Sequence, residues 1–369
     1  MKIRRIILKG VRNFTDFDHC FEDTWNGEVP DSLLLIGPNG SGKTTLLNII
    51  AEMWQMLAEA AISLQGQESR KISGALILND QVLIRGGYAA IEFTGLDAKS
   101  VWVISGSHNP THNLISENID SHRILVTLGV DDKGNRPYYW YSAPGSSEPI
   151  EINQFQLTES HPNWVTEWGR RLEENMLGKR SDMVNMVYLE SEFRVLNKIK
   201  DRFQVTPEPE SFRWLAKYEP TTSRKGSLQN YLYNLKVVDS EDFYRIIKSL
   251  NIFLVGKEII DFSPKGELRV LVNSSYKHPI EDLSAGEKQV LLMLVTLHHW
   301  MQPGGIVLID EPDLHLHVSL MNAFASHLRR MVAEKGGQLI LASHAPELWQ
   351  LFKESEIVRL GKFGMEENL

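Results

Sequence analysis

The feature that most constrains this chain is a glycine-rich turn at residues 37–42, followed by Lys43 and Thr44. The run Gly37-Pro-Asn-Gly-Ser-Gly-Lys-Thr44 matches the pattern G-x-x-x-x-G-K-[ST] in full. Before it stands a short, continuously apolar run at 32–36, typical of a strand buried on both faces of a mostly parallel sheet. After it, apolar residues recur at helical spacing. The pattern predicts a strand, a phosphate-binding loop and a helix.

Each part of this loop has a chemical reason. Glycines let successive backbone N–H groups turn inward around a β-phosphate, and the N-terminus of the following helix adds partial positive charge. Lys43 is expected to bridge the β- and γ-phosphates, and the Thr44 hydroxyl to ligate Mg²⁺. The sequence therefore predicts a site for ATP and Mg²⁺. The residues of the loop that we expect to contact the nucleotide are Gly37, Asn39, Gly40, Ser41, Gly42, Lys43, Thr44 and Thr45.

A second apolar run, at 306–309, ends in the paired carboxylates Asp310 and Glu311. In a parallel sheet this arrangement places an acid at the carboxyl edge, beside the phosphate-binding loop. We expect Asp310 to hold the Mg²⁺ shell and Glu311 to orient and deprotonate the attacking water. Such a pair alone is often only the end of a strand, but a phosphate-binding loop in the same chain favours the functional interpretation.

Two further segments carry polar residues next to apolar runs. Leu283-Ser-Ala-Gly-Glu-Lys-Gln289 precedes a helical pattern, in which Ser284 and Glu287 form a predicted capping box. Ser284 and Gly286 at that N-terminus would also form an anion site. The phosphate-binding loop already has its own helix, so this second site is expected to contact an ATP molecule that is bound elsewhere. The apolar run at 339–342 leads to His344, which we expect to contact the γ-phosphate rather than to be structural.

Taken in this order, the four elements resemble the ABC superfamily of ATPases: phosphate loop, signature, Asp-Glu strand and switch histidine. The run LSAGEKQ, the opening Arg12-Asn13-Phe14 and the run from Asp310 to His317 resemble the SMC, double-strand-break-repair and OLD-type branch more than transporter subunits. The resemblance covers about 1–60 and 255–360. It implies that Arg12 and Asn13 lie at the nucleotide.

The resemblance also implies that Ser284 and Gly286 of one protomer contact the γ-phosphate bound by Lys43 of another, in a head-to-head homodimer. Two positions depart from the family pattern. Residue 285 is Ala where many relatives have Gly, and His317 stands where transporter subunits usually have Asp. The family's Q-loop glutamine has no clear counterpart. The run Tyr188-Leu-Glu-Ser-Glu-Phe-Arg194 is a candidate for that loop, the alternative being an ordinary strand end.

The expected fold is an α/β, P-loop ABC-type ATPase head with a β-rich arm subdomain and a mainly helical insertion. Residues 1–74 and 251–369 would form the two parts of the head. Residues 75–150 show strand-like runs separated by Gly, Asn and Asp, and predict an antiparallel β subdomain. Residues 151–250 are mainly helical in pattern, without the sustained heptads of a coiled coil.

Composition excludes several classes of protein. The formal net charge of −8 argues against a surface coated in basic residues, and the single cysteine, Cys20, excludes an internal disulfide framework and is expected to be buried. Without an apolar run of membrane-spanning length or a secretory signal, a cytoplasmic protein with no membrane association is expected.

Aromatic and basic residues of the insertion could form a nucleic-acid surface, or a solvated helical face with tryptophans in the core. The charge balance favours the second interpretation. The residues in question are Trp164, Trp168, Arg170, Arg171, Arg194, Lys198, Lys200, Arg202, Arg213, Trp214, Lys217, Arg224 and Lys225.

The functional hypothesis is an ATP-hydrolysing head that dimerises around ATP and acts as sensor or motor in a nucleic-acid-linked process. By family analogy that process is prokaryotic anti-phage defence, as for Septu-type and PARIS-type ATPase subunits, or DNA repair. A separate effector, a nuclease or toxin, is expected because roughly 25 residues follow His344. The alternatives are a non-hydrolysing ATP-dependent scaffold for a partner protein and, with less support, a transport ATPase.

Overall fold

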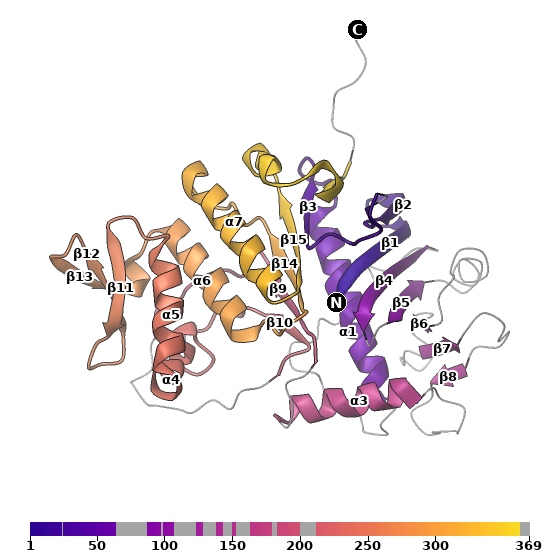
Figure 1. Ribbon diagram of the computed structural model, residues 1–369, viewed down its shortest axis with the longest axis horizontal. Coiled ribbons are helices and arrows are strands. Elements are labelled where there is room, and N and C mark those ends of the chain that lie inside the picture. Colours follow the sequence, from indigo (N-terminus) through magenta and orange to yellow (C-terminus); the bar gives the residue numbers. More distant parts are fainter. Residues whose placement is uncertain are drawn as a thin grey trace, which may run out of the picture.

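A computed structural model of the chain describes residues 1–23, 25–63, 87–96, 99–106, 123–127, 138–142, 150–152, 163–178, 183–199 and 212–361. At the centre lies a parallel sheet in the order β10-β9-β14-β15-β3-β16 (Figure 1). Its strands are β3 (Ser32–Ile36), β9 (Met186–Leu189), β10 (Leu215–Lys217), β14 (Ile306–Asp310), β15 (Gln338–Ser343) and β16 (Ile357–Arg359). The predicted strand at 32–36 is confirmed, as is the Asp-Glu strand. All five residues of β3 and of β14 are buried.

Side chains of the central sheet alternate between two hydrophobic cores. Leu33 and Leu35 pack into one core, while Leu34 and Ile36 pack into the other. This alternation follows from the two-residue period of a strand. It explains the continuous apolar runs, because both faces of these strands are covered by other elements.

Helices divide between the two faces of the sheet. On one face lies α1 (Lys43–Ser63), which follows the phosphate-binding loop as predicted. On the other lie α4 (Leu228–Val238), α5 (Ser240–Asn251), α6 (Ala285–Trp300) and α7 (Val318–Glu334). Figure 1 shows α5, α6 and α7 to the left of the central strands and α1 to the right. The helix of the glycine-rich loop and the helix of the LSAGEKQ segment therefore cover opposite faces.

A second, mixed sheet packs beside α1, in the order β2-β1-β4-β5-β6-β7-β8. It consists of β1 (Lys2–Val11), β2 (Phe14–Cys20), β4 (Tyr88–Leu96), β5 (Lys99–Gly106), β6 (Arg123–Thr127), β7 (Tyr138–Ser142) and β8 (Ile150–Ile152). The antiparallel subdomain expected at 75–150 differs in two ways. The strands β5 and β6 run parallel, and β4 pairs with β1, so this sheet is continuous with the first residues of the chain.

The region 151–250 is not purely helical. It contains α3 (Asn163–Met176), α4 and α5, but also β9 and β10 of the central sheet. The strand β9 pairs in parallel with β14, next to the Asp-Glu pair. Both strands are short, and a short apolar run is compatible with a buried helix as well as with a strand. The expected helical pattern is thus wrong for 215–217, whereas β9 at 186–189 agrees with the strand end considered at residues 188–194.

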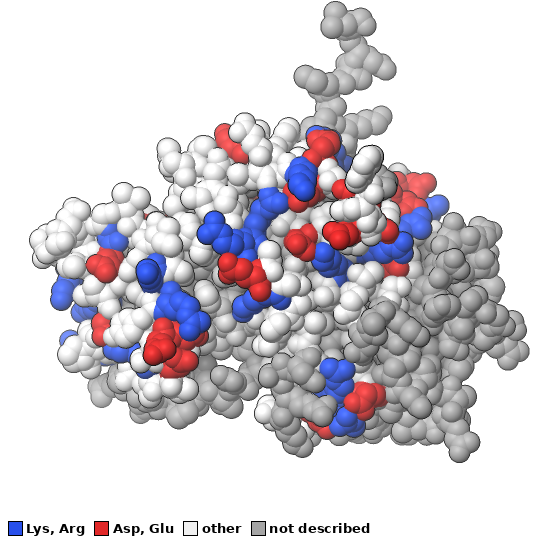
Figure 2. Space-filling view, viewed as in Figure 1, with Lys and Arg blue, Asp and Glu red and all other residues white. Residues whose placement is uncertain are grey.

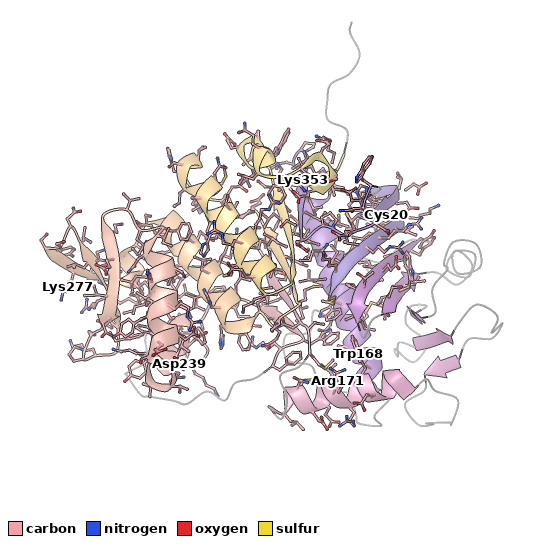
Figure 3. The ribbon with its side chains drawn as sticks, viewed as in Figure 1. Cys20, Trp168, Arg171, Asp239, Lys277 and Lys353 are labelled. Atoms are coloured by element: carbon pink, nitrogen blue, oxygen red, sulfur yellow. The ribbon has the colours of Figure 1, made fainter. Side chains whose placement is uncertain are left out.

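A tryptophan cluster joins α1, α3 and the residue just before β10. The indoles of Trp54 and Trp214 stack at 3.9 Å with an interplanar angle of 4°. Each donates its Nε1–H to the carbonyl oxygen of the other, at 2.9 and 2.8 Å. Trp168 of α3 meets Trp214 edge-on at 5.3 Å, and Figure 3 shows it on the helix below α1. Reciprocal hydrogen bonds satisfy both indole N–H groups in a buried site, so the cluster fixes α3 against the head.

The remaining described elements complete the head. The strands β11 (Lys257–Phe262), β12 (Leu268–Val272) and β13 (Tyr276–Pro279) form a small antiparallel sheet before the 3-10 helix η1 (Ile280–Asp282) and α6. Two further 3-10 helices, η2 (Pro346–Leu351) and η3 (Glu354–Glu356), precede β16. Within the part of the chain that the structure describes, no helix is long and apolar enough to span a membrane.

Cys20 lies at the end of β2 and is exposed (Figure 3). Its expected burial is wrong, because β2 is the edge strand of the mixed sheet and alternates exposed with more buried positions.

Candidate functional site

The glycine-rich loop connects the carboxyl end of β3 to α1, and two of its glycines have left-handed backbone. Gly40 has φ 78° and Gly42 has φ 99°, conformations that favour glycine. Gly42 is also sterically required, since a Cβ there would lie 2.7 Å from Cζ of Phe14. Phe14 is buried beneath the loop. The shape of the loop therefore depends on the opening hairpin as well as on its own glycines.

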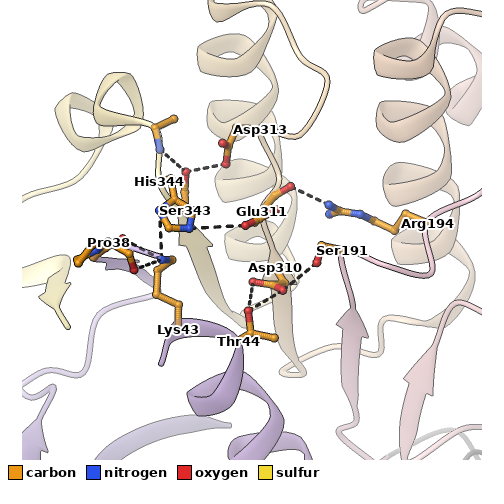
Figure 4. Close-up of polar contacts among 12 residues, drawn as sticks. Pro38, Lys43, Thr44, Ser191, Arg194, Asp310, Glu311, Asp313, Ser343 and His344 are labelled. Atoms are coloured by element: carbon orange, nitrogen blue, oxygen red, sulfur yellow. Dashed lines mark hydrogen bonds and ion pairs between the residues drawn. The ribbon is translucent and has the colours of Figure 1, made fainter. Parts of the chain in front are cut away.

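Lys43 is buried and points into the loop (Figure 4). Its Nζ donates to the carbonyl oxygens of Gly37 at 2.8 Å and Pro38 at 3.2 Å, and lies 3.3 Å from Nδ1 of His344. Burial lowers the pKa of Lys43, while the negative charges of Glu311, Asp310 and Asp313 oppose that shift. A cation held in a loop of inward-facing polar groups is suited to a phosphate.

Asp310 lies at the end of β14 and is 2% exposed. The Thr44 hydroxyl donates to its carboxylate, at 3.0 Å to Oδ2 and 3.2 Å to Oδ1, and the Ser191 hydroxyl donates to Oδ2 at 3.0 Å. Carboxylate and hydroxyl oxygens are the ligands that Mg²⁺ prefers, usually together with substrate phosphates. The residues present therefore fit a Mg²⁺ ion, which would supply charge neutralisation at the phosphates; Thr44 and Asp310 would hold it.

Glu311 follows Asp310 with a left-handed backbone, φ 48°. Its Oε1 lies 3.6 Å from Nε2 of His344, which follows β15. The neighbouring Ser343 hydroxyl donates to Oδ1 of Asp313 at 2.6 Å and accepts from the backbone N–H of Ala345 at 2.9 Å. These bonds fix the turn that carries His344. As Figure 4 shows, the acidic pair, the histidine and the lysine meet at one edge of the sheet.

Two family models match the chain over the elements that build this site. A model described as "ABC transporter" matches residues 27–124, which include the glycine-rich loop. A model described as "AAA domain, putative AbiEii toxin, Type IV TA system" matches residues 232–349, which include the LSAGEKQ segment, the acidic pair and His344.

Both matches support the resemblance to ABC-type ATPases, each over less than half of the chain.

The other proteins that the chain resembles are distant. Protein Ea59 of Escherichia phage lambda is 28% identical over 87 residues, which are 21% of this chain and only 17% of that protein. The SMC head domain from Thermotoga maritima is 13% identical over 95% of this chain and 92% of its own, with a TM-score of 0.43. An SMC head bound to the C-terminal winged-helix domain of ScpA is 13% identical over 99% and 98%, with a TM-score of 0.46.

The LSAGEKQ segment, the expected signature, forms the N-terminus of α6. Ser284 is its N-cap, and the predicted capping box with Glu287 is confirmed. Lys257 donates to Oε2 of Glu287 at 2.7 Å. Burial alone would raise the pKa of Glu287, but the hydrogen bonds from Lys257 and Ser284 hold it below its ordinary value. Ser284 is exposed, and its hydrogen bonds within the described residues are with Glu287 and Lys288 of its own helix.

The opening hairpin lies beside the glycine-rich loop. Asn13 donates its Nδ2–H to the carbonyl oxygen of Gly40 at 2.7 Å, so it supports the loop from outside. Arg12 is exposed at the turn of the hairpin with φ 47°. The nucleotide contact expected of these two residues stays a prediction.

The other predicted loop residues differ in exposure. Asn39 is exposed and Thr45 is partly buried at the start of α1. The Ser41 hydroxyl is buried, and among the described residues it has no hydrogen-bond partner. Nucleotide contacts of these residues also stay predictions.

Sequence reasoning did not identify Ser191 and Arg194 as site residues. Both follow β9, in the 188–194 segment considered for the Q-loop, and both contact the acidic pair. The sequence feature that could have identified them is the apolar run before them, because a similar buried apolar run precedes the Asp-Glu pair. The pairing of β9 with β14 is what brings them to Asp310 and Glu311.

A nucleic-acid surface on the insertion finds little support. Trp168, Trp214, Arg194 and Arg224 are buried. Arg170 pairs with Glu167 and Glu174, and Lys217 pairs with Glu190. Trp164 has no described side chain, and Lys200 and Arg202 lie outside the described residues. On the face shown in Figure 2, basic and acidic residues are interspersed rather than gathered into a basic stripe.

Proposed function

We propose that this chain binds and hydrolyses ATP in a site that two copies complete, head to head. The observation that supports this most directly is the convergence of Lys43, Asp310 and Glu311 at one edge of the central sheet, from segments far apart in the sequence. Phosphoryl transfer is catalysed by positioning and charge stabilisation, and a lysine, a metal-binding acid and a water-activating acid are its recurring parts.

Each residue of the site then has a role. Lys43 neutralises the β- and γ-phosphates, and its present contacts with Gly37 and Pro38 give way to phosphate oxygens. Glu311 orients the attacking water and accepts its proton. His344, 3.6 Å from Glu311, stabilises charge on the γ-phosphate.

The second half of the site comes from the partner copy. Helix α6, which carries Ser284 and Gly286, covers the face of the sheet opposite α1. Ser284 is exposed, and its hydrogen bonds satisfy its own helix end rather than reaching Lys43. A helix N-terminus with an exposed Ser284 suits a phosphate presented by another molecule, while Gly286 is buried behind it.

The cycle of ATP-driven association would serve as a sensor or motor for a nucleic-acid-linked process in the cytoplasm, with a nuclease or toxin supplied by a separate chain. One matching family model is described as a putative AbiEii toxin of a Type IV TA system. The process would be anti-phage defence or DNA repair.

Solution mass in the presence of ATP tests the shared site. We expect Glu311→Gln to accumulate an ATP-held dimer, because ATP stays bound without hydrolysis, and Ser284→Arg to remain monomeric. Matched controls are the exposed positions Glu347→Gln and Ser275→Arg. If oligomeric state ignores both site variants, the shared site is refuted. If the wild type dimerises with ATP but releases no phosphate, the chain is a scaffold rather than a hydrolase.

A further inference from the structure

A buried arginine lies between the signature helix and the acidic pair. Arg194 is 3% exposed, on the segment that follows β9. Burial lowers the pKa of Arg194 to about 10, although the charges of Asp310, Glu311 and Asp313 oppose the shift. Removing a guanidinium from water is costly, so its place in the molecule requires specific partners.

The first partner is the backbone of Glu311. Arg194 donates from Nη2 to the Glu311 carbonyl oxygen at 2.7 Å, as Figure 4 shows. That oxygen also accepts from the N–H of Leu314 at 3.2 Å, and the Glu311 N–H donates to Ala342 at 2.8 Å. Glu311 is a non-glycine residue at φ 48°, a conformation that persists only where its surroundings impose it. Among the groups that hydrogen-bond to the Glu311 backbone, the Arg194 guanidinium is the one that carries a charge.

The second set of partners lies on α6. Gln289 donates its Nε2–H to the backbone oxygen of Arg194 at 2.8 Å, and Arg194 Nη1 donates to Sδ of Met293 at 3.4 Å. Gln289 and Met293 are four residues apart on one face of the helix whose first turn carries Ser284 and Gly286. Arg194 therefore contacts α6 on one side and the Glu311 backbone on the other.

We propose that Arg194 is a positioning residue that couples α6 to Glu311, so that the position of the signature helix sets the orientation of the residue that activates water. A phosphate bound at the N-terminus of α6 would shift the helix and with it Gln289 and Met293. Because both residues contact Arg194, the shift would change the position of the Glu311 backbone. This inference rests on the proposed function, in which Glu311 is the general base. It adds a reason why hydrolysis waits for two heads to meet.

The test is the single-turnover rate of ATP hydrolysis in Arg194→Lys. Lysine keeps the charge but lacks the planar fork that reaches two partners. We expect hydrolysis to slow roughly 100-fold, as for a misplaced catalytic group, with ATP affinity and the ATP-held dimer unchanged. Gln289→Met, which removes only the donor to the Arg194 carbonyl, should slow hydrolysis in the same direction by less. Lys198→Ala, at an exposed position on the same segment, is the matched control.

Combining Arg194→Lys with Glu311→Gln separates positioning from general structural damage. If Arg194 acts through Glu311, the double variant hydrolyses ATP as slowly as Glu311→Gln alone. The coupling would be refuted if the double variant were slower than Glu311→Gln by the full factor that Arg194→Lys alone produces. It would also be refuted if both Arg194→Lys and Gln289→Met hydrolysed ATP at the wild-type rate. Wild-type hydrolysis by Glu311→Gln itself would instead refute the proposed role of Glu311, whatever Arg194 does.

Discussion

The backbone of His315 lies so close to Gly286 that a Cβ at position 286 would come within 2.6 Å of the His315 carbonyl oxygen. His315 is itself in the left-handed region, with φ 65°. The signature helix and the segment after the acidic pair are therefore in backbone contact within one chain. A glycine is needed at 286 for this packing in addition to any contact with a phosphate.

Gly286→Ala should therefore impair two features with one methyl group. The helix start and the His315 turn must separate, and we expect the ATP-held dimer to be lost while the monomer still binds ATP at Lys43. Light scattering with ATP, alongside binding of a fluorescent ATP analogue, measures the two effects. The neighbouring exposed Ala285→Ser is the control. A Gly286→Ala variant that dimerises normally would contradict this prediction.

Ser191→Ala should lower the affinity for Mg²⁺ and leave the affinity for ATP unchanged. Asp310 would keep its hydrogen bond from Thr44 but lose the one from Ser191, a change of about 1 kcal/mol. We expect the Mg²⁺ concentration for half-maximal ATPase rate to rise roughly fivefold at saturating ATP. Ser355→Ala, at an exposed position, should leave that concentration unchanged. An unaltered Mg²⁺ titration would show that Ser191 plays no part in the Asp310 site.

Lys43→Met should abolish tight ATP binding without unfolding the protein. Loss of a charge-assisted contact costs about 1.5–3 kcal/mol, so affinity should fall roughly 10- to 100-fold. Because burial lowers the pKa of Lys43, its charge is not a source of stability, and the melting temperature without nucleotide should not fall. Calorimetric titration and thermal melts check both statements, with exposed Lys353→Met as control. Unchanged affinity would remove Lys43 from the site.

Two histidines at the end of α6 should make the fold sensitive to acid. Burial lowers the pKa of His298 to about 4 and that of His299 to about 3, with Lys335 and Arg213 adding to the respective shifts. The unfolded state then binds protons more readily, so stability is fully present above pH 6.5 and falls as the pH drops toward these values. Between pH 7 and 5 the loss should be about 1–2 kcal/mol per histidine.

His299→Phe tests this dependence because it keeps a ring against Tyr231 and Trp300, whose ring centroids both lie 3.9 Å away. Urea unfolding at pH 7 and pH 5 should show a smaller difference for this variant than for the wild type. Substitution of the exposed His315 by Asn should leave the difference unchanged. Equal differences in all three proteins would show that His299 is not the group that titrates.

Local patterns in the sequence were sufficient for the elements that carry the site. The run at 32–36, the glycine-rich turn and the capping box at Ser284 were each predicted correctly, because buried strands, left-handed turns and helix caps are encoded by neighbouring residues. The acidic pair at the end of β14 was predicted for the same reason. The resemblance to the ABC superfamily followed from the order of these local signals.

The sheet pairings were decided by tertiary structure. β9 and β10 are too short to be distinguished from helix by periodicity. The place of β9 depends on β14, more than a hundred residues away in the sequence, and β10 pairs with β9. The same holds for Cys20, whose exposure reflects an edge strand. Ser191 and Arg194 became site residues only because β9 pairs with β14.

The sequence by itself therefore determined the chemistry: a lysine and a threonine after a glycine-rich turn, two carboxylates after a buried strand, and a histidine after another. Only the tertiary structure decided which side chains control those groups, because hydrogen bonds such as those from Arg194 to Glu311 and from Asn13 to Gly40 join residues with no local relationship in the chain.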